Sequence, residues 1–137
     1  MAPEELVKTV VQALEQADFE PLLNAISDDV VWKSAATMKG FFRTGGQYTG
    51  RQGVEQWKSE VETDYIIRSI TPKEIVTKGD VMWGLFWVDL LYKPTLAQVC
   101  FDGAVRWRLK DGKLVERQAF IDTAAVLIQE QSGLLPR

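Results

Sequence analysis

The first part of the chain carries apolar residues at helical spacing, which predicts amphipathic helices. The first such stripe runs to about Ala17, and Pro3 suits the first turn of that helix. Asp18 is suited to cap a second, shorter helix, which we expect to end by Ser27. Val30-Val31-Trp32 is typical of a short strand. The chain is therefore expected to begin with two helices and a strand.

A glycine-rich stretch separates this region from the next. Residues 40–53 hold five of the ten glycines, which predicts a loop. A third helix follows, with Val54, Trp57 and Val61 at the spacing of one buried face. This helix is expected to pack its apolar face toward the core.

The period changes from about 3.6 to about 2 at Tyr65, where β-branched and aromatic residues become frequent. Strands are predicted over residues 70–77, 81–92, 97–109 and 114–121. Asp111-Gly112 is the strongest hairpin signal, because a type I′ turn needs positive φ at both central residues. A last helix, capped by Asp122, is expected to end near Ser132. Helices followed by an antiparallel meander predict an α+β domain with helices on one face of a curved sheet.

Composition places these elements in one domain spanning 1–137. The 137 residues include 46% hydrophobic ones, enough for one core, and no linker divides them. A formal net charge of −3 gives no basic surface, so we do not expect a nucleic-acid partner. No apolar run approaches the roughly 20 residues that span a bilayer, and the start is acidic, unlike a secretory signal. The expected location is cytoplasmic, with no membrane partner.

The absence of histidine restricts the chemistry. It removes Ser-His-Asp and Cys-His nucleophile systems and His-ligated zinc. The single Cys100 excludes an internal disulfide and cysteine-rich metal clusters, and it is expected to be a small buried filler. We therefore expect no metal and no cofactor. Any reaction has to use carboxylates, tyrosine, lysine or arginine.

The hairpin at Asp111-Gly112 predicts the faces of its two strands. Counting back from the turn places Leu109 opposite Leu114 and Arg106 opposite Arg117. One predicted face is mainly apolar and comprises Phe101, Val105, Trp107, Leu109, Leu114 and Phe120. The other, which we call the mixed face, comprises Cys100, Asp102, Ala104, Arg106, Arg108, Arg117 and Ile121, extended by Trp83, Leu85, Trp87 and Asp89 on the preceding strand.

The composition of the mixed face permits two interpretations. Indoles, carboxylates and guanidiniums together suit a pocket for a flat apolar ligand that bears an anionic or carbonyl group. Alternatively, the face is solvated and its charges pair on the surface, as charged clusters usually do. Two opposed arginines would repel unless a carboxylate or a bound anion lies between them.

The order of motifs resembles the SnoaL-like, nuclear transport factor 2-like superfamily over nearly the whole chain. The resemblance rests on the Asp28-Asp29-Val30-Val31-Trp32 segment, on residues 45–54, and on the ending from Phe120-Ile121-Asp122-Thr123 through residues 133–136. It implies a cone-shaped α+β barrel, with N-terminal helices packed on the concave face of a strongly curved, mostly antiparallel sheet. It also implies a pocket on the concave face and a homodimer through the convex face. The mixed face would then point inward, and the face with Trp107 outward.

The resemblance also allows comparison of catalytic positions. The phenol, base and oxyanion-hole acid of ketosteroid isomerases fall at Val10, Ser34 and Ala104, so steroid isomerisation by that mechanism is disfavoured. The five catalytic positions of limonene epoxide hydrolases correspond to Trp32, Ser34, Trp87, Asp89 and Ala119, and only the aspartate is retained. The late aspartate of polyketide cyclases also falls near Ala119. Asp89 is therefore the leading candidate.

We accordingly expect Asp89 to act as general base and Arg106 or Arg117 to stabilise an enolate or alkoxide. The alternative is that Asp89 only forms an ion pair with one of these arginines. Ligand contacts are predicted for Trp32, Tyr48, Trp83, Trp87, Asp102 and Ala119. The alternative interpretation assigns the indoles to the core and gives Tyr48 only the role of anchoring the glycine-rich loop.

The predicted function is a small-molecule pocket protein. The first hypothesis is a cofactor-free acid/base enzyme of isomerase, hydrolase or cyclase type that acts on a small hydrophobic carbonyl, epoxide or polyketide-like compound. The second is a non-catalytic module that binds a small anionic or aromatic ligand. A third is a scaffold that works through its convex apolar face.

Overall fold

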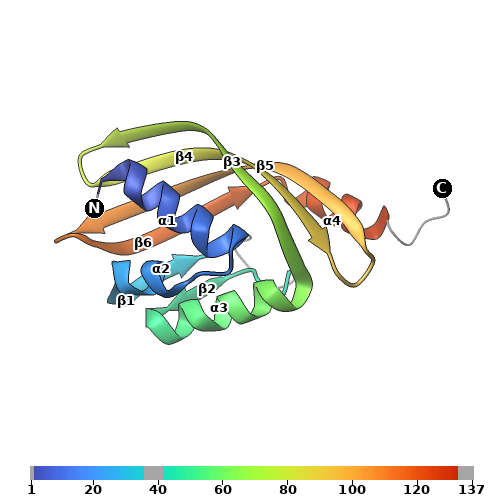
Figure 1. Cartoon of the computed structure of the whole chain (residues 1–137), viewed down its shortest axis with the longest axis horizontal. Coiled ribbons are helices and arrows are strands. Elements are labelled where there is room, and N and C mark those ends of the chain that lie inside the picture. Colours follow the sequence, from blue (N-terminus) through green and yellow to red (C-terminus); the bar gives the residue numbers. More distant parts are fainter. Residues whose placement is uncertain (1, 36–41, 133–137) are drawn as a thin grey trace.

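The sequence folds into helices packed against one curved sheet, seen in a computed structural model that describes residues 2–35 and 42–132 (Figure 1). The elements in chain order are α1 (Pro3–Glu15), α2 (Glu20–Ala25), β1 (Ile26–Lys33), β2 (Gln47–Thr49), α3 (Gly50–Asp64), β3 (Tyr65–Lys78), β4 (Val81–Tyr92), β5 (Ala97–Lys110), β6 (Lys113–Ile121) and α4 (Thr123–Ser132). The expected order of helices and strands is confirmed, and the α+β class with it. The predicted glycine-rich loop lies partly outside the described residues, and its last residues instead form β2 and the first turn of α3.

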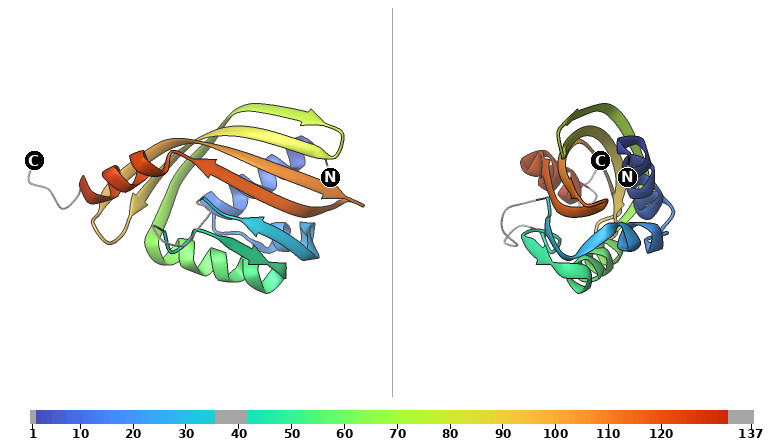
Figure 2. Two further views of the ribbon diagram at one scale, coloured as in Figure 1. Left: turned by 180° about the vertical axis from the view of Figure 1, so that it is seen from behind. Right: turned by 90° about the vertical axis from the view of Figure 1, so that its left-hand side faces the viewer.

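The six strands form an open sheet in the order β2-β1-β6-β5-β4-β3. β1 pairs with β6 in parallel, and the other neighbours are antiparallel. The sheet curves strongly, so that α1 and α3 face its concave side while α4 lies at the far end of β5 (Figure 2). α1 and α4 lie toward opposite ends of the long axis (Figure 1).

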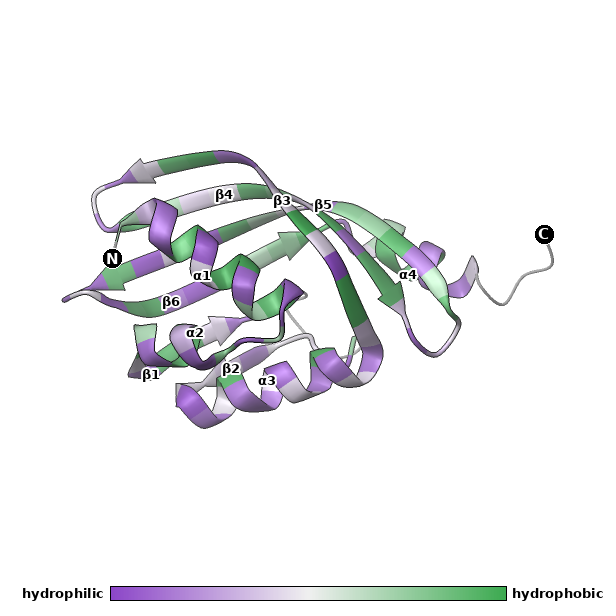
Figure 3. Ribbon diagram, viewed as in Figure 1, coloured by the Kyte–Doolittle hydropathy of each residue, from purple (hydrophilic) through white to green (hydrophobic). Residues whose placement is uncertain are grey.

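The amphipathic pattern of the helices explains how they pack. Leu6 and Ala13 of α1 are fully buried, whereas Glu4 and Glu5 at its start are exposed. Colouring by hydropathy shows green and purple segments alternating along α1, as two faces of one helix require (Figure 3). α3 follows the same principle, with Val54 buried toward the sheet. The main core therefore lies between α1, α2, α3 and the concave face of the sheet.

Of the two predicted helix N-caps, one is confirmed and one is wrong. The Asp122 carboxylate accepts a hydrogen bond from the Ala125 backbone N–H at 3.1 Å, which confirms it as the cap of α4. The predicted cap at Asp18 is wrong, because the N-cap residue of α2 is Phe19 and makes no side-chain cap bond. Asp18 instead accepts a hydrogen bond from Gln12 Nε2 at 2.7 Å.

The Asp111-Gly112 turn is confirmed, with φ of 51° and 75°, but the predicted register beyond it is wrong. Leu109 pairs with Leu114 as expected, and a bulge then leaves Val115 without a partner, so Arg108 pairs with Glu116. One extra residue on β6 transfers its following side chains to the opposite face of the sheet. Arg117 consequently lies opposite Trp107, and Arg106 lies opposite Gln118.

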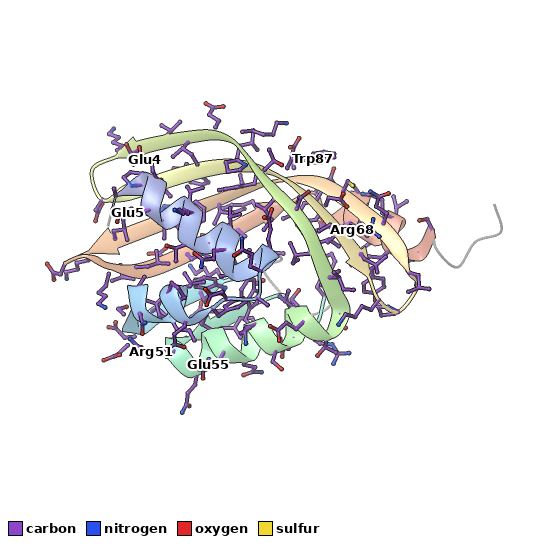
Figure 4. All side chains as sticks on the ribbon, in the orientation of Figure 1. Glu4, Glu5, Arg51, Glu55, Arg68 and Trp87 are labelled. Carbon is purple, nitrogen blue, oxygen red and sulfur yellow. The ribbon has the colours of Figure 1, made fainter. Side chains whose placement is uncertain are left out.

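The orientation of the mixed face is the main correction. The β4–β5 pairing does place Trp83, Leu85, Trp87 and Asp89 beside Arg106, Ala104, Asp102 and Cys100, as predicted. This face, however, is convex and solvent-facing, with Trp83 at 42% and Trp87 at 41% exposure. Figure 4 shows Trp87 on the side of the sheet away from the helices. Trp107 is only 1% exposed and belongs to the core, so its predicted place on the convex face is also wrong.

Candidate functional site

The concave face of the sheet and the helices enclose a cavity of about 150 Å³. An apolar cavity of roughly this volume accommodates a molecule about the size of benzene. Most lining side chains are apolar and come from every layer of the fold. Those from the helices and the loop are Val10, Leu14, Phe42, Trp57, Val61 and Val126, and those from the strands include Ile67, Ile70, Phe86, Val88, Leu90, Phe101, Val105, Trp107, Ala119 and Ile121.

Arg117 introduces a positive charge into this apolar lining. It lies on β6 beside Trp32 of β1 and Trp107 of β5 in the register of the sheet, and its side chain is 9% exposed. The guanidinium carbon lies 4.8 Å from the Trp32 ring and 5.0 Å from the Trp57 ring. These contacts with two indoles hold the guanidinium at the cavity wall through cation–π attraction.

The hydrogen bonds of Arg117 are incomplete. Nη1 donates to the backbone carbonyl of Lys33 at 3.1 Å, and the buried Nε has no hydrogen-bond partner. No carboxylate of the described residues lies within 4 Å of this guanidinium. Desolvation by burial lowers the pKa of Arg117 to about 9. At neutral pH the group still carries a charge that no acidic side chain compensates.

Two smaller polar side chains also line the cavity. Ser34, at 5% exposure, follows β1 and accepts a hydrogen bond from Trp57 Nε1 at 2.8 Å. Thr44 also lines the cavity and is 6% exposed. The Ser34 bond fixes the Trp57 indole that packs on Arg117. The sequence therefore positions the guanidinium through its neighbours on β1 and α3.

A second polar group contacts the cavity at the start of β3. Tyr65 lines the cavity, and its hydroxyl donates a hydrogen bond of 2.5 Å to Glu130 Oε1 on α4. Glu130 is 6% exposed, and burial together with the nearby Asp64 raises the pKa of its carboxyl. Burial and the Glu130 carboxylate also raise the pKa of the Tyr65 phenol. Tyr65 therefore remains a protonated phenol at neutral pH.

The structure brings only part of the predicted site together. Arg117 and Ala119 line the cavity, and Trp32 lies behind the Arg117 guanidinium. Trp32 is 2% exposed and forms part of the core, as the alternative interpretation of the indoles expected. The Tyr48 hydroxyl donates to Glu60 and also lies 3.2 Å from the backbone carbonyl of Arg43, so it anchors the loop before α3.

The remaining predicted residues lie on the convex face, away from the cavity. Arg106 forms an ion pair with Glu116 at 2.9 Å, and Asp102 forms one with Lys73 at 3.1 Å. Asp89 lies within 3.4 Å of Gln98 Nε2. These charges have polar partners at the surface, as the alternative interpretation of the mixed face expected. Asp89, Arg106, Asp102, Trp83 and Trp87 are consequently not assembled around the cavity.

Sequence reasoning missed three residues that shape the site: Trp57, Tyr65 and Glu130. Trp57 was assigned only to the buried face of its helix, and Tyr65 only marked the change of period. Glu130 follows Val126 by one helical turn, so it lies on the same face of α4 as a buried valine. An acidic residue at that spacing was the available signal for a buried carboxyl.

Two kinds of site have no support among residues 2–35 and 42–132. No group of three cysteine, aspartate or glutamate side chains is placed to hold a metal ion. Within the same residues, no helix is long and apolar enough to cross a membrane.

Comparisons with known proteins agree with this fold. The family model of the SnoaL-like domain matches residues 7–117. The structure of a proposed isomerase from Rhodopseudomonas palustris superposes with a TM-score of 0.81 at 16% identity, covering 93% of each chain. TerC co-crystallised with polyporic acid gives 0.79 at 20% identity, covering 93% of this chain and 97% of the other. An LEH-like epoxide hydrolase from M. tuberculosis gives 0.73 at 18%, covering 95% and 90%. No curated protein matches the sequence.

Proposed function

This chain belongs to the SnoaL-like domain family, and from that premise we propose that its cavity binds a small, largely apolar ligand through an anionic or carbonyl oxygen at Arg117. One observation carries the proposal. Arg117 is a buried cation without a carboxylate partner among the described residues, and it lines an apolar cavity. An isolated buried charge is costly, so a site that retains one is suited to a ligand that supplies the opposite charge.

The guanidinium geometry favours a planar oxygen pair as the recognised group. Arginine presents N–H donors in a fixed fork that matches both oxygens of a carboxylate. The indoles of Trp32 and Trp57 cover the guanidinium, which leaves its edge for hydrogen bonding. The small cavity volume limits the apolar part of the ligand to about one ring. Aromatic carboxylates are therefore the class that fits best.

Binding is better supported than catalysis. An acid/base enzyme acting on a hydrophobic carbonyl, epoxide or polyketide-like compound remains the second candidate. Arg117 would supply the stabilisation of an enolate or alkoxide that such an enzyme requires. The base proposed for that reaction, Asp89, lies on the convex face, and no carboxylate side chain is among the lining residues. Activity assays with a panel of such compounds, without added cofactor, test this candidate. Turnover that requires Arg117 would favour it.

Calorimetric titration with benzoate and with benzamide tests the binding proposal. Benzoate is expected to bind the wild type more tightly than neutral benzamide, and Arg117→Met is expected to remove this preference. Arg106→Met is the matched control, because Arg106 lies on the convex face and pairs with Glu116. Equal benzoate affinity in wild type and Arg117→Met would refute the assignment.

We also propose that two copies associate through the convex face. Trp83, Trp87 and Phe120 are 41–46% exposed there, and the rings of Trp83 and Phe120 stack with centroids 6.0 Å apart. Exposed aromatic side chains on one face are typical of an interaction surface. The cytoplasmic location expected from the sequence stays a prediction.

A further inference from the structure

The cavity contains a second polar position besides Arg117, because Tyr65 also lines it. Arg117 packs on Trp32 of β1 and Trp57 of α3, whereas the Tyr65 hydroxyl bonds to Glu130 of α4. The cavity thus has two polar groups, held by different elements, in a mainly apolar lining.

Each polar position involves an ionisable side chain that has no oppositely charged partner among the described residues. Arg117 lacks a carboxylate partner, and Glu130 behind Tyr65 has no cationic side chain of the described residues within 4 Å. The groups around Glu130 are Tyr65, Asp64 and Tyr92, with Arg43 close to Tyr92. Burial and Asp64 both raise the pKa of the Glu130 carboxyl, in agreement with a carboxyl that lacks a cationic partner.

Hydrogen-bond direction determines what Tyr65 recognises. A phenol has one hydrogen to donate, and Tyr65 donates it to Glu130 Oε1. The lone pairs on the Tyr65 oxygen remain free to accept. Glu130 is held in place, because Thr95 Oγ1 donates to its backbone carbonyl. The Tyr65 oxygen is therefore set to accept a hydrogen bond, and Glu130 acts as a positioning residue.

We propose that the cavity selects a flat, single-ring aromatic carboxylate that carries a hydroxyl or amino group on the side of the ring away from the carboxylate. The carboxylate contacts Arg117, and the far hydroxyl or amine donates to the Tyr65 oxygen. This inference rests on the proposed function at Arg117 and adds a second contact that selects a donor group on the ligand. A compound with a hydrogen-bond donor at the far end gains a buried bond that an unsubstituted analogue lacks.

Calorimetric affinities of benzoate and 4-hydroxybenzoate test the second contact. The two probes share the carboxylate and the ring and differ only in the far hydroxyl. We expect the wild type to bind 4-hydroxybenzoate about fivefold to tenfold more tightly. Tyr65→Phe is expected to reduce this ratio to about one. Tyr92→Phe is the control, because its ring packs against Tyr65 yet does not line the cavity.

Glu130→Gln distinguishes a positioning role from a purely structural one. The glutamine amide is close in size and can still hold α4 against Tyr65, but its NH₂ group can donate to the phenol oxygen and occupy the acceptor position. The ratio of the 4-hydroxybenzoate affinity to the benzoate affinity should therefore fall in this variant. An equal loss of affinity for both probes would overturn the positioning role.

The outcomes separate the two proposals. A ratio near one in the wild type, with benzoate binding that depends on Arg117, overturns the Tyr65 contact and leaves the proposed function standing. Binding of neither probe, or binding that is unchanged in Arg117→Met, overturns both.

Discussion

Arg117 sets the properties of the cavity at the scale of single residues. Burial of a guanidinium costs several kcal/mol, and contacts with two indoles and one backbone carbonyl recover only part of this. Replacement of a buried charged group by an apolar side chain of similar volume is often neutral or stabilising. If Arg117 serves ligand binding, its replacement should therefore raise the free energy of unfolding of the ligand-free protein. If Arg117 is structural, its replacement should lower that free energy.

The first prediction concerns stability. Arg117→Met should raise the free energy of unfolding of the ligand-free protein by about 1 kcal/mol or more, because methionine retains the apolar contacts with Trp32 and Trp57 without a desolvated charge. Urea denaturation followed by tryptophan fluorescence measures this. Arg106→Met, which breaks an ion pair on the convex face, should instead have an effect of at most about 1 kcal/mol in the destabilising direction. A large destabilisation by Arg117→Met would identify Arg117 as structural.

The second prediction concerns pH. The pKa of Arg117 is lowered to about 9 in the free protein, and a bound carboxylate favours its protonated form. Benzoate affinity should consequently be constant from neutral pH to about 9 and fall as the pH rises above it, since binding then requires uptake of a proton. Titrations across this range in the wild type measure the effect. Constant affinity up to pH 11 would show that the carboxylate does not bind at this group.

At the scale of elements, β6 decides which arginine reaches the cavity. The hairpin turn and the bounds of β4 were predictable, because turn chemistry and alternation are local signals. The bulge at Val115 was not, because an unpaired residue depends on how the strand fits its neighbours on both sides. Because of this one-residue shift, Arg117 lies with the side chains that face the cavity. Uninterrupted alternation predicts it on the same face as Arg106.

Element packing also limits the volume of the cavity. A Cβ atom at Gly84 of β4 would lie 2.5 Å from the ring of Phe86 and 3.0 Å from Ile75 Cδ1. Phe86 is 3% exposed and packs edge-on against Trp107, so its ring has little room to move. The glycine allows β3 and β4 to pack with Phe86 directed into the cavity.

The third prediction follows from this contact. Gly84→Ala should destabilise the protein by about 1–3 kcal/mol through overpacking and should weaken benzoate binding, because Phe86 must move. Thermal unfolding and calorimetric titration measure the two effects. Gly103→Ala is the matched control on the cavity wall, where the added Cβ meets Ile121 Cγ2 at an ordinary 3.4 Å. Similar losses in both variants would contradict the role assigned to Phe86.

At the scale of the whole molecule, the curvature of the sheet separates two surfaces of different character. The concave face encloses the cavity, and the convex face exposes aromatic side chains next to paired charges. The resemblance in the sequence correctly indicated the family and the curved sheet. The inference drawn from it, that the mixed face points inward, is wrong, because alternation defines two faces of β4 and β5 without saying which one the helices cover. Asp89 lies on the convex face and Trp107 in the core, the reverse of the prediction.

The fourth prediction concerns association through the convex face. Trp87→Lys should convert a dimer into a folded monomer, because it places a charge at the centre of the proposed contact. Light scattering coupled to size-exclusion chromatography measures the mass, and circular dichroism checks the fold. Ile128→Lys on α4 is the control, because Ile128 is exposed at 70% and lies outside that face. A monomeric wild type, or a dimer unaffected by Trp87→Lys, would contradict the proposed interface.

A crystal structure of the protein with 4-bromobenzoate tests the central claim most directly, because anomalous scattering locates the bromine independently of the model. We predict a carboxylate within hydrogen-bonding distance of the Arg117 guanidinium and a bromine peak inside the cavity, near Phe86 and Val88. An empty cavity at saturating ligand, or a bromine peak only on the convex face, would contradict the account.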